Sequence, residues 1–295
     1  GDVYKRQVLA NSSLRWETGE TQNIAVDAKL FKSKLSFTGE YYVRKTKDIL
    51  LSVTIPPSVG LNAPTQNAGE VWNTGYDLSV GWNDFIGDNF RYGFNFNYST
   101  FDNEIKELGG LDKLPPGNLI NRVGGEINAI HGLIVEGLYQ ESDFDADGNL
   151  NAGLPTPSFG AIQAGDIKYA DISGPDGVPD GELNNDDRTS IGSSITNETW
   201  GFDLFAEYKG IDLSVSFIGE GGRDVMLQGD VGWTFFNAGK IQEWQTDYWT
   251  PSNTDSAYPR LHPASSHPNW RVNETWLFDT SYTRLRNITL GYKLP

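Results

Sequence analysis

Two consecutive runs of alternating residues, between Gly75 and Phe101, constrain the fold of this chain more than any other feature. In each run every second residue is apolar, and the residues between are polar or glycine. The apolar positions are Tyr76, Leu78, Val80 and Trp82, then Phe90, Tyr92, Phe94, Phe96 and Tyr98. A period of two predicts two strands, each with one apolar and one polar face. Such a hairpin fits a soluble sandwich, with the aromatic rows buried between sheets. It also fits a membrane barrel, with those rows facing lipid and the polar rows facing a wet lumen.

The same alternation recurs elsewhere in the chain. A first hairpin is expected from a strand at Asn23–Phe31, a tight turn at Lys32–Ser33 and a return strand through Val43. A third hairpin turns at Gly210, and a last strand contains Ile288, Leu290 and Tyr292. A proline-containing loop is expected at about 46–66. The sequence therefore predicts about seven strands.

The lengths of the connections separate the two architectures. The tight turns at Lys32–Ser33, 84–89 and Gly210 all fall at one end of the strands, and the long connections, at about 102–197 and 219–280, fall at the other. Short turns on one rim and long loops on the other are typical of outer-membrane barrels, whereas a Greek-key sandwich would mix them. We expect an all-β chain, a partial transmembrane antiparallel β-barrel with long extracellular loops. Since seven strands are too few and odd in number, both ends are expected to lie inside a larger barrel.

Composition excludes several classes. The formal charge is −16, from 23 Lys and Arg against 39 Asp and Glu, which argues against nucleic-acid binding. There is no cysteine, so disulfides and thiolate chemistry are excluded. No apolar run approaches the roughly 18 residues of a transmembrane helix. This does not exclude a membrane barrel, because the alternating strands of a barrel contain no long apolar run. Gly1–Gln7 lacks the apolar core of a secretion signal and is expected to be a scar, so either the protein is cytosolic or its true N-terminus lies outside this sequence.

Several short motifs follow one another along the chain. They are Leu14-Arg15-Trp16-Glu17, Tyr41-Tyr42-Val43-Arg44-Lys45-Thr46-Lys47-Asp48-Ile49-Leu50, Gln66-Asn67-Ala68-Gly69-Glu70-Val71-Trp72-Asn73-Thr74-Gly75, Gly165-Asp166-Ile167-Lys168-Tyr169, Asp187-Arg188-Thr189-Ser190-Ile191-Gly192, Trp249-Thr250-Pro251 with Pro259-Arg260, and Tyr282-Thr283-Arg284-Leu285-Arg286-Asn287-Ile288-Thr289-Leu290-Gly291-Tyr292. In their order and coverage, from about Leu14 to Pro295, they resemble the SusC/RagA family of TonB-linked outer-membrane transporters.

The resemblance implies a barrel of about 22 strands with a plugged lumen, of which residues 14–295 are a late, C-terminal portion and residues 1–13 a scar segment and loop. It implies an outer-membrane importer of oligosaccharides or peptides with no catalytic role. A SusD-like lipoprotein would cap the mouth, and TonB would act through an N-terminal region that this sequence does not include. The alternative is a soluble, secreted β-sandwich that binds or cleaves glycans.

One acidic segment has the spacing of a calcium loop. Asp176, Asp180, Glu182, Asn184 and Asp187 fall at positions 1, 5, 7, 9 and 12, around Gly181 at position 6. Position 3 is Val178, which supplies no ligand, and Asp171 is a candidate replacement if it folds back. A calcium site is one expectation, and a solvated acidic loop is the other.

Two further features remain open. A second acidic run, with Asp143, Asp145 and Asp147, has Leu154 where a bidentate acid belongs, which favours a plain surface loop. The segment 219–280 holds five tryptophans and predicts a short helix near Gly239–Tyr248. The tryptophans either stack on sugars or pack this segment onto itself.

Overall fold

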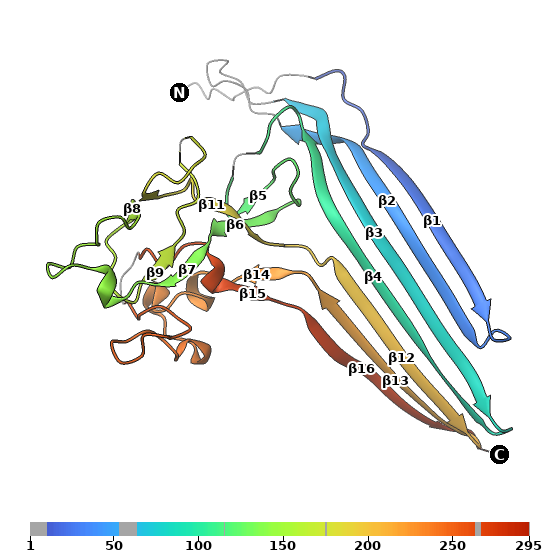
Figure 1. Ribbon diagram of the computed structural model, residues 1–295. Helices are drawn as coiled ribbons and strands as arrows, with labels where there is room; N and C mark the ends of the chain where they lie inside the picture. Colours follow the sequence, from blue (N-terminus) through green and yellow to red (C-terminus); the bar gives the residue numbers. More distant parts are fainter. Residues whose placement is uncertain (1–10, 53–63, 115, 175, 263–266, 295) are drawn as a thin grey trace, which may run out of the picture.

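One seven-stranded antiparallel sheet dominates the structure, a computed structural model that describes residues 11–52, 64–114, 116–174, 176–262 and 267–294 (Figure 1). Along the sheet its strands are β1 (Thr18–Leu30), β2 (Leu35–Ser52), β3 (Thr65–Ile86), β4 (Phe90–Leu108), β12 (Glu198–Tyr208), β13 (Ile211–Gly221) and β16 (Tyr282–Tyr292). Each strand is antiparallel to its neighbours. The predicted wall of seven up-and-down strands is confirmed.

The connections divide between the two ends of this sheet, as the sequence predicts. Tight turns at 31–34, 87–89 and 209–210 lie at one end, beside the C-terminus (Figure 1). In the shortest turn, Lys209 and Gly210 both have positive φ, 47° and 83°, which matches the right-handed twist of the flanking strands. The long connections lie at the opposite end and form a separate lobe (Figure 1).

Several strands extend beyond the bounds expected from the sequence. β2 continues to Ser52 and β3 begins at Thr65, so both strands enter the expected loop at 46–66. β4 continues to Leu108. At about 3.3 Å per residue the 22 residues of β3 span about 70 Å, whereas the apolar band of a membrane barrel is about 25 Å tall. The upper halves of these strands therefore extend past such a band. The apolar row of the outer face ends there, and the apolar residues that remain do not follow the same alternation, so the sequence signal is lost.

The lobe is built from residues 109–197 and 222–281 and contains only short elements. Its strands are β5 (Leu119–Ile120), β6 (Ala129–Leu133), β7 (Val135–Leu138), β8 (Thr156–Pro157), β9 (Ile167–Tyr169), β10 (Glu182–Leu183), β11 (Arg188–Gly192), β14 (Asp224–Met226) and β15 (Leu277–Asp279). Its 3-10 turns are η2 (Glu141–Asp143), η3 (Gly229–Val231), η4 (Phe236–Ala238), η5 (Glu243–Gln245) and η6 (Glu274–Trp276). The helix expected at Gly239–Tyr248 is reduced to η5. Across the described residues, no helix has the length and apolar character needed to span a membrane.

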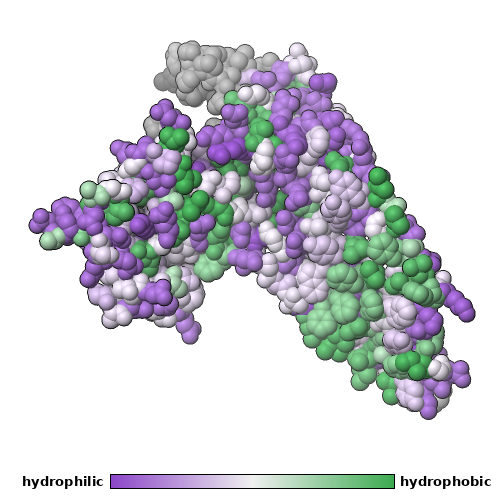
Figure 2. All heavy atoms as spheres, viewed as in Figure 1, coloured by the Kyte–Doolittle hydropathy of each residue, from purple (hydrophilic) through white to green (hydrophobic). Residues whose placement is uncertain are grey.

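The apolar rows of neighbouring strands lie in register on one face of the sheet. Phe96, for example, is paired with Val80 on one side and with Phe202 on the other. Aromatic residues end the band, with Tyr41 and Tyr76 5.1 Å apart toward the lobe and Phe90 beside Tyr208 toward the turns. Figure 2 shows hydrophobic side chains gathered over the lower part of the sheet and hydrophilic ones above.

No second sheet covers this face within the described residues, because the other sheets have only two or three strands and belong to the lobe. Leu78, Val80, Phe94 and Phe96 are half-buried, by neighbours on their own face, and Ile24 is 74% exposed. The two-sheet sandwich is therefore wrong for this chain.

Candidate functional site

The opposite face of the sheet is polar along its length. The register brings polar residues of neighbouring strands together: Asp77 with Ser99, Ser79 with Asn97, Asn95 with Asp203, and Arg91 with Glu207. Side chains bond across the strands, with Thr38 donating to Asp27 at 2.7 Å and Arg91 to Asn83 at 3.1 Å. This face is therefore a continuous row of hydrogen-bonding groups.

The lobe is anchored on this polar face. Val71 and Ile105 are paired and alternate in phase with the polar Asn73 and Asn103, so they lie on the same side. Both are buried, packed against Leu111, Leu114 and Ile127 of the long connection. Backbone bonds of 2.8 Å join Ile105 to Gly124 and Gly125, and Ile127 N donates to Asn103 Oδ1 at 2.9 Å. The connection after β4 therefore folds inward, over the polar side, an arrangement that alternation alone did not predict.

A second core holds the lobe together. Leu133, Ile167, Tyr169, Leu183 and Trp276 are almost completely buried in it. Several of the tryptophans pack around this core. Trp244 contacts Tyr258, Trp276 and Phe278, and Trp276 Nε1 donates to Asn269 O at 2.7 Å. For these residues, packing of the segment onto itself is what the structure shows.

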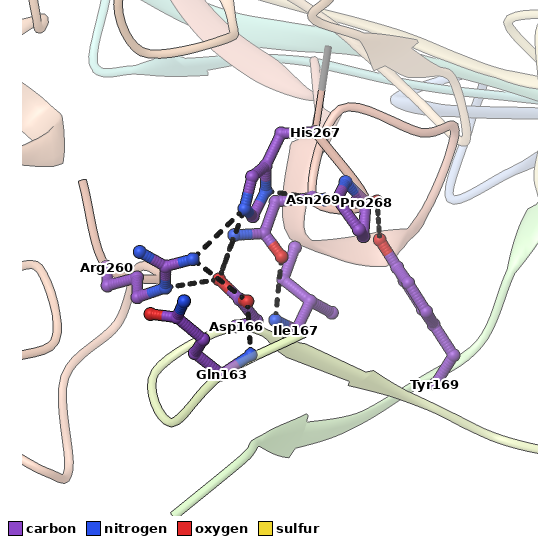
Figure 3. Close-up of polar contacts among 8 residues, drawn as sticks. All are labelled: Gln163, Asp166, Ile167, Tyr169, Arg260, His267, Pro268 and Asn269. Atoms are coloured by element: carbon purple, nitrogen blue, oxygen red, sulfur yellow. Dashed lines mark hydrogen bonds and ion pairs between the residues drawn. The ribbon is translucent and has the colours of Figure 1, made fainter. Parts of the chain in front are cut away.

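A buried polar cluster lies beside this core (Figure 3). Asp166 has no exposed surface, and Arg260 binds it through Nε at 2.7 Å and Nη2 at 3.2 Å. Asn269 Nδ2 and Gln163 N also donate to its carboxylate, at 3.1 and 2.8 Å. The buried charge is thus paired in the bidentate geometry that arginine favours and is hydrogen-bonded as well.

His267 completes this cluster as a neutral ring. Burial lowers its pKa to about 4, although the nearby Asp166 carboxylate acts in the opposite direction. Nδ1 accepts from Asn269 N at 3.2 Å, and Nε2 lies 3.6 Å from Asp166 Oδ1. Nε2 also lies 3.2 Å from Arg260 Nη2, so the ring contacts both members of the buried ion pair (Figure 3). The ring therefore orders the 267–269 backbone without adding a second buried charge.

Motif residues that are far apart in the sequence meet in this lobe. Asp166 belongs to one motif and Arg260 to another, and Gly165, with φ of 86°, lies beneath the ring of Trp249. Arg260 N donates to Gly165 O at 2.8 Å. The two motifs are far apart in the sequence, and the one signal there for their contact is that the first contains a carboxylate and the second a guanidinium group.

A similar junction lies at the start of the sheet. Asn67 Nδ2 donates to Arg15 O and Asp48 O, both at 2.8 Å, and Asn67 Oδ1 accepts from Arg15 N at 2.8 Å. One amide side chain thus joins three motifs at the lobe end of β1, β2 and β3.

The structure uses the acids of the expected calcium loop as backbone acceptors. Asp187 is buried and accepts from Ile172 N, Ser173 N and Asn184 N at 2.9, 3.1 and 2.8 Å. Asp171 does fold back, accepting from Asp180 N and Gly181 N at 3.3 and 2.7 Å.

The remaining acids of this loop are not gathered around one point. Asp180 and Asn184 each accept a local N–H, from Glu182 and Asp186, while Asp176 and Glu182 are exposed. In the part of the chain that the structure describes, no three acidic or histidine side chains are placed to hold a metal ion. Calcium binding here stays a prediction.

The second acidic run forms a local turn. Asp145 Oδ1 accepts from Asp147 N at 2.9 Å and from Asn149 N at 2.8 Å. The bond from Asn149 is the main reason why the pKa of Asp145 is lowered. This is the exposed, turn-rich loop that the sequence favours.

Comparison with curated proteins links the whole chain to receptors. TonB-dependent receptor P26 of Formosa agariphila is 31% identical over 297 residues, and TonB-dependent receptor P3 of the same organism 29% over 301 residues, each match covering 97% of the chain. TonB-dependent receptor SusC of Bacteroides thetaiotaomicron is 33% identical over 116 residues, 38% of the chain. The chain spans 28% of the length of P3 and of P26, and 12% of SusC. No family model matches it.

Solved structures agree with this relationship. The RagAB peptide transporter matches 97% of the chain with a TM-score of 0.73 and 26% identity. The RagAB peptide importer in its open-open state matches 98% with a TM-score of 0.74 and 25% identity. The chain covers 30% and 29% of those chains. The match includes both the sheet and the lobe.

Proposed function

Because this chain is a relative, over 97% of its length, of TonB-dependent receptors of the SusC/RagA kind, we propose that it forms part of the wall and the extracellular lobe of an outer-membrane importer. The solute is an oligosaccharide or a peptide. Uptake is driven by TonB through a region outside these residues, and a SusD-like lipoprotein closes the extracellular mouth. The role is transport, not catalysis, in keeping with relatives named as receptors and transporters.

One observation carries this proposal: the sheet has two opposite faces of different chemistry. One face is apolar, uncovered and bounded by aromatic rows, and the other is polar and cross-bonded. Tyr98 and Phe90 are eight residues apart on β4, about 27 Å along the strand and about 20 Å after a tilt of about 40°. That distance suits the hydrocarbon band of a membrane.

The lobe supports a capture role. It is anchored at Val71 and Ile105 on the polar side, at the end away from the tight turns. In this orientation it lies over the entrance to the lumen, where it would meet both the solute and the lipoprotein. Its core and buried ion pair make it a firm platform, not a loose loop.

The solute class is proposed on two grounds. The polar wall offers amides, hydroxyls and carboxylates, which suit a hydrophilic oligomer. The RagAB structures are named as a peptide transporter and importer, which favours peptides over oligosaccharides for this chain.

Fractionation and uptake together test this proposal. The receptor carrying this chain is expected in the outer-membrane fraction, extracted only with detergent, with heat-dependent mobility on a gel. Cells should grow on peptides or oligosaccharides as a sole nutrient source only when both this receptor and TonB are intact. A freely soluble protein, or growth unaffected by loss of the receptor, would refute it. Deleting an unrelated TonB-dependent receptor serves as the matched control.

A further inference from the structure

A cavity of about 270 Å³ lies between five segments of the lobe, one of which is β6 with Leu133. Arg188 comes from β11, Arg271 and Trp270 from the segment before η6, Trp233 from the segment after η3, and Asn118 from the connection after β4. Binding sites for drug-sized ligands usually have volumes of about 300–1,000 Å³. This cavity is therefore sized for one unit of an oligomer.

Two arginines line this cavity without a carboxylate partner among the described residues. The Arg188 Nη2 donates to the carbonyls of Gly117 and His131. The Arg271 guanidinium lies 3.9 Å from the centre of the Phe159 ring. Burial lowers the pKa of both, and the charge of Arg271 lowers that of Arg188 further, so the two guanidinium groups lie within electrostatic reach of each other.

Unsatisfied donors point to the missing chemistry. Arg271 Nε and Trp233 Nε1 are buried and have no hydrogen-bond partner among the residues that the structure describes. Buried donors are normally paired, because an unpaired one loses its bond to water without replacement. The lining contains no acidic residue, although the chain has an excess of 16 negative charges. The cavity thus has two positive groups, two unpaired donors and no negative charge in its lining, and a carboxylate would supply both the negative charge and acceptor oxygens.

We propose that Arg188 and Arg271 form a subsite for the terminal carboxylate of a peptide, an inference that rests on the proposed import function. A guanidinium offers a planar fork of N–H donors that matches the two oxygens of a carboxylate. The adjoining carbonyl of the peptide supplies an acceptor for Trp233 Nε1. The side-chain amides of Asn118 and Gln228, bonded to each other at 3.3 Å, face the same cavity and suit a peptide group. A terminal carboxylate is common to all peptides, so this subsite would hold many sequences.

Calorimetry with the full receptor in detergent tests the subsite. The probes are two mixtures of short synthetic peptides without Asp or Glu, identical except that the carboxyl terminus is free in one and amidated in the other. Amidation is expected to weaken binding at least about tenfold in the parent receptor, as loss of a charged hydrogen bond would. In Arg271→Gln the free-acid mixture should bind as weakly as the amide, and amidation should no longer matter.

Two further variants keep this test decisive. Arg122→Gln removes an exposed arginine that does not line the cavity and should behave as the parent. Arg188→Gln also loses bonds to Gly117 and His131, so Arg271→Gln, which loses no hydrogen bond, decides the outcome.

An equal amidation penalty in the parent and in Arg271→Gln overturns the subsite. Arg271-dependent binding of oligomeric uronic acids, with no binding of either peptide mixture, overturns the peptide assignment. If TonB-dependent uptake persists in either case, the import function stands without the subsite.

Discussion

Asp166 and its partners illustrate how single residues hold the lobe together. Arg260 neutralises the buried carboxylate through two bonds, and Asn269 bridges it to the backbone of Ile167. His267 fits beside this pair only as a neutral ring, since a further positive charge would have to be desolvated. The stability of this cluster therefore depends on pH.

The first prediction concerns that pH dependence. The pKa of His267 is about 4 in the folded lobe and about 6.5 in an unfolded chain. Between these values the unfolded chain binds a proton that the folded lobe does not. Stability is therefore fully present above about pH 6.5 and is lost as the pH falls toward 4, by up to about 1.4 kcal/mol per pH unit. Hydrogen exchange of the lobe in the receptor, at pH 7 and at pH 5, measures this loss.

His267→Gln supplies the comparison. Glutamine keeps an acceptor for Asn269 N but does not titrate, so the loss between pH 7 and pH 5 should shrink. His131 and His262, whose pKa values burial also lowers, should account for part of what remains. Equal losses in the parent and the variant would contradict the assigned role of His267.

At the scale of elements, the hairpins combine two environments in one strand. Alternate residues of β4 face opposite sides, so Phe96 lies in the apolar row between Val80 and Phe202, while Asn97 lies in the polar row beside Ser79. Toward the lobe the same strands lose this contrast, and the burial of Ile105 reflects contact with the long connection instead. Whether a charged substitution is tolerated therefore depends more on the face of the sheet that a residue occupies than on the strand to which it belongs.

The second prediction compares two neighbouring residues on opposite faces. Phe96→Arg places a charge in the middle of the apolar band and is expected to destabilise the folded barrel by about 2–4 kcal/mol. Asn97→Arg places the same charge on the exposed polar face and should cost little. Denaturant unfolding of the receptor in lipid vesicles, followed by gel mobility, measures both. Comparable losses in the two variants would mean that the band does not face hydrocarbon.

The whole molecule has one property that no single strand shows: its sheet has two open edges. Among the described residues β1 pairs only with β2, and β16 only with β13. Within hydrocarbon each unpaired backbone group costs several kcal/mol, which is why spanning sheets close on themselves. The outer edges of β1 and β16 therefore need partners, supplied by further strands or by a second copy.

The third prediction follows from those edges. The 295-residue chain alone, refolded into lipid vesicles, should give aggregates or edge-paired oligomers and no heat-resistant monomer. The longer receptor, refolded in the same way, should give a monomer that denatures only on heating. Gel mobility and protease protection of the strands distinguish these outcomes. A protected monomer of the chain alone would show that the edges close without added strands.

The sequence by itself determined the number of strands, the two faces of their alternating parts and the end at which the long connections lie, but not the full length of β2, β3 and β4. A strand with lipid on one side and water on the other must alternate in hydropathy. The alternating residues at Tyr76–Trp82 and Phe90–Tyr98 therefore indicate the environment of each face directly from the sequence. Only the tertiary structure decided which lobe residues meet. Asp166 and Arg260 are 94 residues apart, Arg188 and Arg271 lie in different connections, and Ile105 is buried by a segment that follows it. Such contacts depend on how irregular segments pack against one another, and no periodic pattern along the chain records that packing.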